Sequence, residues 1–165
     1  MRMIQLSGLL SALALALAGC SPSSSDAAPQ STQAAAPAVH PESGLPVVPL
    51  RVIHGNKTFA FRVEVARTGQ EQAKGLMFRT AMGPDEGMIF PMDPPRGASF
   101  WMRNTVIPLD LIFVGTDGRI SNIAANAVPY DETPLQSTGL VKAVLELNGG
   151  RAAQLGIVPG DRVEW

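Results

Sequence analysis

The chemically richest part of this sequence is the segment from Phe100 to Asp110. It places aromatic, cationic, amide, hydroxyl and carboxylate side chains close together along the chain, at Trp101, Arg103, Asn104, Thr105 and Asp110. Loops that combine such side chains often carry binding or catalytic residues. The segment is therefore the first candidate for a ligand or partner site.

Asp110 is expected on a largely apolar face. In the strand predicted at 109–114, alternation puts it on the same side as Ile112. A carboxylate in such a place must be paired, hydrogen-bonded or neutralised. Arg103 and Arg79 are the candidate partners.

Three uses of this segment stay open. The first is structural: an ion pair of Asp110, with a turn stabilised by Asn104 and Thr105. The second is a ligand pocket floored by Trp101 and polarised by Arg103, Asn104 and Asp110. The third is a hydrolase or transferase site in which Asp110, Arg103 and Asn104 act on a small polar substrate.

The methionines form a second unusual cluster. All those after Met3 fall between positions 77 and 102. Thioethers can hold Cu(I), and the candidate ligands are Met77, Met88, Met92 and Met102. Methionine is also a common filler of irregular cores, and this interpretation is favoured. We expect no cofactor.

Other catalytic sets are missing from the sequence. His54 is the only histidine in the predicted domain, and it lies in a predicted turn, where a histidine is usually just solvated. There is no Ser-centred elbow, Cys–His pair or Gly-rich phosphate loop. The net charge of −1 gives no field that would gather nucleic acid. These absences favour a non-catalytic binding domain.

The only cysteine, Cys20, follows an apolar run at 4–17 that begins after Arg2. These are the parts of an export signal. The tetrapeptide from Leu17 to Cys20 resembles the lipobox of bacterial lipoproteins. That resemblance implies removal of the preceding peptide, lipidation at Cys20 with acyl chains such as palmitate, and export to the cell envelope. Ser21 after the cysteine implies the outer membrane, facing the periplasm.

The chain divides into three parts. Residues 1–19 are the predicted signal peptide, 20–46 a lipidated cysteine and a disordered Ser/Ala/Pro tether, and 47–165 one globular domain. His40 lies in the predicted tether and is expected to be inert. The predicted partners are the membrane, through the lipid, and an unknown small ligand or envelope protein.

The predicted domain is mostly β. Two β-rich runs flank a turn at 54–57, which predicts a hairpin. A capping box at Thr68–Glu71 begins a helix that is expected to end between Leu76 and Arg79. A second short helix is expected from Asn148, as its cap, to Gln154, with Gly156 as its stop. Seven or eight short strands with two short helices predict a small β-barrel or sandwich.

Three blocks of this domain resemble the domain of unknown function family numbered 192. They are 75–79 with 87–90, then 100–105 with 107–110, then 144–147 with 156–157 and 160–161. The resemblance covers nearly all of 47–165. It implies a compact, β-rich and often exported domain, and it transfers no catalytic residues because the family has none established.

Overall fold

A computed structural model of the chain describes residues 38–165. Cys20, the predicted signal peptide and most of the predicted tether lie outside the described residues. The described part is mostly β with two short helices, as predicted. Its strands are β1 (Ala38–Val39), β2 (Pro46–His54), β3 (Lys57–Val65), β4 (Glu86–Arg96), β5 (Ser99–Phe100), β6 (Leu109–Gly115), β7 (Ile120–Ala127), β8 (Leu135–Gln136), β9 (Val141–Asn148) and β10 (Arg162–Glu164). The helices are α1 (Gly69–Lys74) and α2 (Arg151–Leu155).

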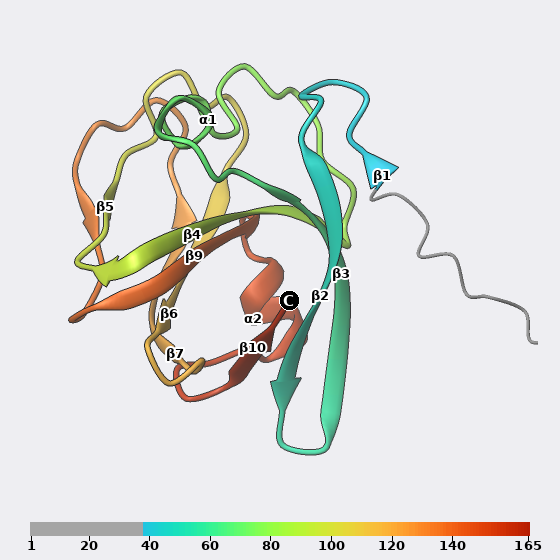
Figure 1. The fold of residues 1–165 in the computed structure, drawn as a ribbon, viewed down its shortest axis with the longest axis vertical. Helices are drawn as coiled ribbons and strands as arrows, with labels where there is room; N and C mark the ends of the chain where they lie inside the picture. The colour runs from blue at the N-terminus through green and yellow to red at the C-terminus, as the bar shows by residue number, and fades with distance from the viewer. Residues whose placement is uncertain (1–37) are drawn as a thin grey trace, which may run out of the picture. The chain divides into compact units, whose positions relative to one another are not determined.

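The strands form one mixed sheet of eight strands, with β5 and β8 paired separately (Figure 1). The order is β1-β2-β3-β4-β9-β6-β7, and β10 pairs with β2. Among the strands of residues 38–165, only β3 and β4 run parallel. The sheet is not a closed barrel, because no continuous ladder joins β10 to β7. An isolated bridge between Arg119 and Arg162 and a few backbone hydrogen bonds between residues 118–120 and 160–163 link the two ends. Among residues 38–165, neither helix has the length and apolarity to cross a bilayer.

The predicted hairpin is confirmed. β2 and β3 pair from Val47 with Glu64 to His54 with Lys57, which leaves a two-residue turn at 55–56. Gly55 has a φ of 56°, a backbone conformation that glycine adopts without steric cost.

The first helix begins as predicted and ends earlier. The Thr68 side chain accepts a hydrogen bond from the Glu71 N–H, and the Glu71 carboxylate accepts one from the Thr68 N–H. The helix ends at Lys74 because Gly75, with a φ of 47°, turns the chain away. A Cβ at Gly75 would lie 3.4 Å from the Phe90 ring, so glycine also permits close packing there.

The predicted cap of the second helix is wrong. Helix α2 begins at Arg151 after Gly150, with no side-chain cap. Asn148 is still in strand β9, and its side-chain amide donates instead to the carbonyls of Met82 and Gly83. Gly156, with a φ of 75°, ends the helix as predicted.

The sheet has an apolar core on each face. Strand β9 supplies both, because Ala143, Leu145 and Leu147 join one cluster whereas Val144 joins the other. Helix α2 packs into the first cluster through Ala152. The chain just after α1 packs into the second through Leu76. In Figure 1 the two helices accordingly lie on opposite sides of β4 and β9.

The chain joins the domain before the predicted boundary at position 47. Ala38 pairs with Val47 in the β1–β2 ladder, and Leu45 packs against the second core cluster. Composition alone predicts a tether over 38–46, because these residues are similar in composition to those before them. Backbone pairing, which composition does not reveal, holds them in place.

Candidate functional site

A cavity of about 410 Å³ opens between α1 and the segment that carries β5. Its wall combines apolar and aromatic side chains with polar and charged ones. It is lined by Gln72, Ala73, Lys74, Gly75, Leu76, Met77, Phe90, Met92, Arg96, Gly97, Ala98, Ser99, Phe100, Trp101, Thr105 and Glu146. A volume of this size is typical of small-molecule sites.

Glu146 supplies the buried carboxyl group of this cavity. It lies in β9, opposite Met88 of β4 on one side and Leu111 of β6 on the other. Both neighbours belong to the core cluster beneath α1, and Glu146 is 5% exposed. Within residues 38–165, its carboxyl group has neither a hydrogen bond nor a salt bridge with another protein group.

Burial raises the pKa of Glu146 from 4.5 to about 8. The cause is desolvation, which penalises the charged carboxylate. The side chain is therefore mostly a neutral carboxylic acid at pH 7. In this state it can both donate and accept a hydrogen bond toward the cavity.

Gly87 explains how β4 and β9 come close enough to hold this site. A Cβ at Gly87 would lie 2.5 Å from the carbonyl oxygen of Glu146 and 2.9 Å from a methyl group of Leu147. Only glycine fits such an approach. The backbone of Glu146 therefore packs closely against Gly87, which has no side chain in the way.

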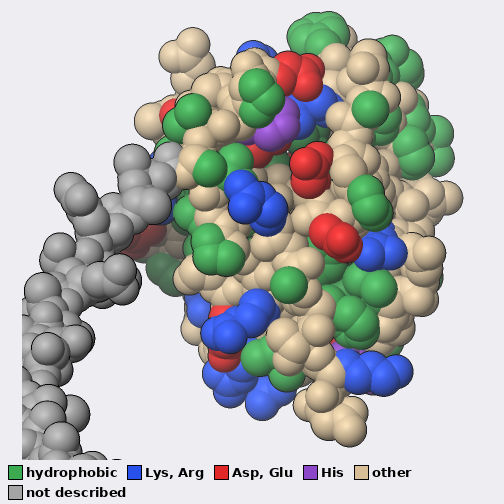
Figure 2. Space-filling model, turned by 90° about the vertical axis from the view of Figure 1, so that its right-hand side faces the viewer, with side chains coloured by type: hydrophobic (Ala, Val, Ile, Leu, Met, Phe, Trp, Pro, Cys, Tyr) green, Lys and Arg blue, Asp and Glu red, His purple; other side chains and the backbone are tan. Residues whose placement is uncertain are grey.

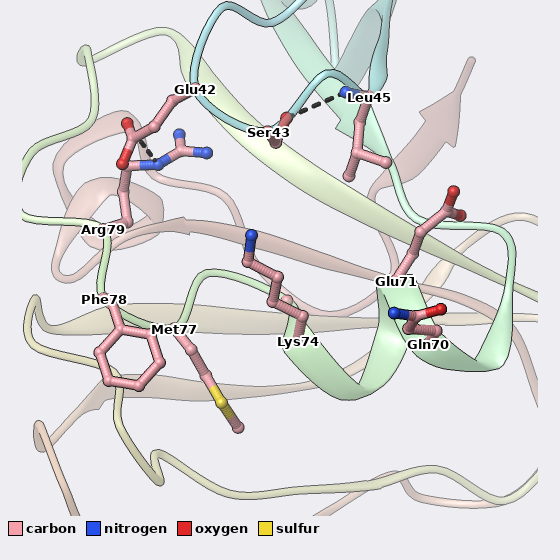
Figure 3. A pocket seen from close by; sticks show the side chains of 10 residues that line it. Glu42, Ser43, Leu45, Gln70, Glu71, Lys74, Met77, Phe78 and Arg79 are labelled. Atoms are coloured by element: carbon pink, nitrogen blue, oxygen red, sulfur yellow. Dashed lines mark hydrogen bonds and ion pairs between the residues drawn. The ribbon is translucent and has the colours of Figure 1, made fainter.

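A second cavity of about 270 Å³ adjoins the first and shares Lys74, Gly75 and Met77 with it. Figure 3 shows Lys74 extending between α1 and the Glu42–Arg79 ion pair. The lining of this second cavity includes the exposed Gln70 and the half-buried Glu71. The larger cavity is the stronger candidate because it alone contains Glu146.

Asp110 does not pair with an arginine, so the predicted partners are wrong. Its Oδ1 accepts backbone N–H groups of Asn126 at 2.7 Å and Gly150 at 2.9 Å. Its Oδ2 accepts the N–H of Ala152 at 2.8 Å. Asp110 is fully buried and is absent from the lining of the cavity. It anchors the start of α2 to the sheet.

Arg79 pairs instead with Glu64. Its two terminal nitrogens lie 2.8 and 3.2 Å from the Glu64 carboxylate oxygens, and both residues are buried. The Nε of Arg79 lies 2.9 Å from Glu42, and His40 Nδ1 lies 3.7 Å from Glu64. Segment 38–46 therefore helps to neutralise a buried ion pair, and His40 is part of this cluster.

The remaining predicted site residues separate into two groups. Trp101 and Thr105 line the larger cavity. Asn104 contacts that wall by donating to the sulfur of Met77 at 3.8 Å. Arg103 lies at the surface, 3.8 Å from Glu132. The predicted turn is present, since Thr105 donates from its N–H to the Met102 carbonyl.

The four methionines named as candidate Cu(I) ligands lie in two different places. Met88 and Met102 are fully buried in the core cluster beneath α1, which fits the predicted packing role. Met77 and Met92 line the larger cavity. No group of three or more His, Cys, Asp or Glu side chains in residues 38–165 could hold a metal ion.

His54, predicted to be merely solvated, has a carboxylate partner. Its Nδ1 lies 2.9 Å from Asp161, which also accepts the N–H of Val158. This contact links the β2–β3 hairpin to the turn before β10.

Glu146 was missed from the sequence, although a signal exists. It is the only charged residue between Val144 and Leu147, in a strand that is otherwise apolar at 143–147. The same alternation that singled out Asp110 puts Glu146 beside Val144 on an apolar face.

The pKa of Glu146 predicts how stability depends on pH. Between about pH 4.5 and 8 the folded protein keeps a proton that the unfolded chain loses, so stability falls as the pH rises through this window and then levels off. Glu146→Gln is neutral in both states. We expect the variant to be more stable than the parent at pH 8 by about 3–5 kcal/mol, at ~1.4 kcal/mol per pKa unit. The difference should vanish below pH 4.5.

Urea unfolding of parent and variant at a series of pH values measures this difference. Glu132→Gln, at an exposed carboxylate, is the matched control and should leave the pH profile unchanged. Parallel profiles for Glu146→Gln and the parent would show that Glu146 ionises normally in the fold.

Comparisons with known proteins place this domain among uncharacterised ones. The family model DUF192, described as "Uncharacterized ACR", matches residues 51–165. A crystal structure of a protein of unknown function from Novosphingobium aromaticivorans DSM 12444 is 67% identical, with a TM-score of 0.77. The match covers 80% of this chain and 94% of that one.

A second solved structure, from Sinorhizobium meliloti 1021, is called a candidate transcription regulator. It is 40% identical, with a TM-score of 0.71, and the match covers 73% of this chain and 94% of that one. No curated protein matches.

Proposed function

This chain belongs to the uncharacterised DUF192 family, and we propose that its domain binds a small molecule with both an apolar and a polar part in the Glu146 cavity. The observation that carries the proposal is a largely buried carboxyl group that has no partner among residues 38–165 and lines a cavity of about 410 Å³. Its oxygens are not sealed off from that cavity. A ligand in the cavity can therefore hydrogen-bond Glu146 directly.

The chemistry of the wall defines the ligand class. Phe90, Met92 and Phe100 present apolar surface, whereas Glu146 and Thr105 present one carboxyl and one hydroxyl group. Lys74 and Arg96 also line the cavity. The ligand is therefore a compact molecule with an apolar part and a polar part that can hydrogen-bond a carboxylic acid.

The predicted location is part of this proposal. Lipidation at Cys20 would hold the domain at the cell envelope, in the outer membrane facing the periplasm, as its signal sequence indicates. The ligand would then be a molecule that reaches the envelope. We do not extend the regulator label of the Sinorhizobium protein to this chain. The net charge is −1, and Figure 2 shows acidic and basic side chains interspersed on the face it presents.

Two other functions, a hydrolase or transferase site and Cu(I) binding, receive different support. Asp110, Arg103 and Asn104 do not share a site, so a hydrolase or transferase built on them has no geometric basis. Cu(I) binding has one favourable observation, because Met77 and Met92 line the same cavity as Glu146. It is the second candidate, and Cu(I) is included in the test below.

A single substitution at the cavity wall tests the proposal. Ala73 is exposed on α1 and lines the cavity, so Ala73→Trp would fill space without disturbing the core. The probe is N-phenyl-1-naphthylamine, a small uncharged aromatic amine whose fluorescence rises in apolar surroundings. We expect Ala73→Trp to weaken probe binding by about tenfold or more, which corresponds to ~1.4 kcal/mol or more.

The matched control is Ala153→Trp, at an exposed position of α2 away from the cavity. It should bind the probe like the parent. The protein is the unlipidated mature chain, residues 20–165 with Cys20→Ser, so that no detergent competes for the probe. Equal binding by Ala73→Trp and Ala153→Trp would rule out this cavity as the site. Binding of Cu(I), but not of the probe, would favour the metal alternative.

A further inference from the structure

Four large apolar side chains are exposed in three loops next to the larger cavity. Phe78 is 65% exposed, Trp101 50%, Val128 62% and Tyr130 61%. We call these four residues the aromatic surface. Exposed apolar side chains that gather in one place mark a site of contact with a partner or a membrane.

Backbone hydrogen bonds hold the three loops together. The N–H of Phe78 donates to the Asn104 carbonyl at 2.9 Å, and the N–H of Tyr130 donates to the Met102 carbonyl at 3.1 Å. The N–H of Met102 in turn donates to the Asp131 carbonyl at 2.7 Å. These hydrogen bonds fix the relative positions of the loops that carry the aromatic surface. Trp101 also lines the larger cavity, so the surface continues into the cavity wall.

Two of these aromatic residues have a backbone conformation that side chains disfavour. Phe78 has a φ of 64° and Tyr130 a φ of 63°. For a residue with a Cβ, the left-handed region costs about 1–2 kcal/mol. Such strain persists where the rest of the structure over-determines it, and it clusters at functional sites. Here it accompanies two aromatic side chains that remain exposed.

The composition of the aromatic surface is that of a protein resting on lipid. Trp and Tyr are enriched where a protein meets the membrane–water interface, because their rings are apolar and carry a polar group. Arg103 lies over the Trp101 ring at 5.7 Å and is half exposed, and Glu132 is its carboxylate neighbour at 3.8 Å. An arginine at this place can contact lipid phosphates.

The predicted anchor limits how far the domain can be from the bilayer. The 18 positions from Cys20 to Ala38 span at most ~65 Å even when fully extended. A domain held at this distance has a high effective concentration at the bilayer surface. A weak lipid-contacting surface is then sufficient.

We propose that the aromatic surface rests on the bilayer to which Cys20 is anchored, with the aromatic side chains in the lipid headgroup region. This inference rests on the lipid anchor of the proposed function. It brings the mouth of the Glu146 cavity close to the membrane surface. The molecules that reach the cavity would then include those dissolved in the bilayer.

Fluorescence quenching tests the contact. The full-length protein is purified from membranes and reconstituted into vesicles of phosphatidylethanolamine and phosphatidylglycerol. Trp165→Phe leaves Trp101 as the only tryptophan. We expect lipids brominated on their acyl chains to quench Trp101, and its emission maximum to lie further to the blue than in Phe78→Asn/Tyr130→Asn on the same background. Asparagine tolerates a positive φ, so this variant should fold.

Two controls make the result decisive. Trp101→Phe retains Trp165, which lies outside the aromatic surface and should not be quenched. Leu140→Asn removes an exposed apolar side chain elsewhere and should leave Trp101 quenching unchanged. If brominated and ordinary lipids give the same Trp101 emission, the aromatic surface does not contact the bilayer. The mass of the mature protein reports acylation at Cys20, and probe binding reports the cavity. Each part of the proposal therefore has a separate readout.

Discussion

Replacing Asp110 with Asn is expected to lower the free energy of unfolding by about 3–5 kcal/mol. The Asp110 carboxylate is fully buried and accepts three backbone N–H groups, from Asn126, Gly150 and Ala152. Hydrogen bonds to a charged acceptor are stronger than neutral ones. An amide replaces one acceptor oxygen with an NH₂ donor, which would face at least one of these N–H groups.

Urea denaturation measures this loss. Asp131→Asn is the matched control, because the exposed Asp131 accepts a single backbone N–H, from Thr133 at 2.8 Å. It should cost less than about 1 kcal/mol. Below its unfolding temperature, Asp110→Asn should bind N-phenyl-1-naphthylamine like the parent, since Asp110 does not line the cavity. A folded variant that lost the probe would place Asp110 in the binding site after all.

Replacing Arg79 with Met is expected to destabilise the protein by a similar amount, about 3–5 kcal/mol. Arg79 and Glu64 are 5% and 3% exposed and form a two-point ion pair. Removing the cation leaves a buried carboxylate with only His40 nearby. The loss of stability comes from the unpaired buried charge. Adding Glu64→Gln to Arg79→Met removes that charge, so the double variant should regain part of the lost stability.

Arg51→Met provides the comparison for this pair. Arg51 and Glu164 form an ion pair at 3.2 Å, but their side chains are 62% and 41% exposed. An exposed pair contributes about 0–1 kcal/mol because water and salt screen it. If Arg79→Met costs no more than Arg51→Met in urea denaturation, then water reaches the Arg79–Glu64 pair and the buried-charge argument fails.

The strands, turns and helix ends that are determined by neighbouring residues could be predicted from the sequence. The β2–β3 hairpin follows from alternation on either side of a turn, and the start of α1 follows from reciprocal hydrogen bonds within Thr68–Glu71. Gly156 ends α2 because glycine adopts the left-handed conformation without cost. In each case the residues that decide the structure are neighbours in the chain.

The partners of buried charges could not be predicted in this way. Alternation correctly put Asp110 on an apolar face and required a partner for it. The partners are backbone N–H groups 16 to 42 positions away in the chain. Almost every residue has a backbone N–H, so the residue types do not show which of these donors will meet Asp110. The pairing of β7 with β6 and the approach of α2 to β6 select them. For the same reason Arg79 was assigned to the wrong carboxylate.

The sequence by itself therefore determined the local elements, the need to neutralise particular buried charges and the resemblance to an uncharacterised family. The tertiary structure decided which groups meet. It placed Glu146 in the central strand β9, facing a cavity that α1 and the segment 96–105 enclose. The physical reason is that a cavity is space left between elements that are distant in the chain. Its size and its unsatisfied groups depend on how those elements pack, and no local pattern records them.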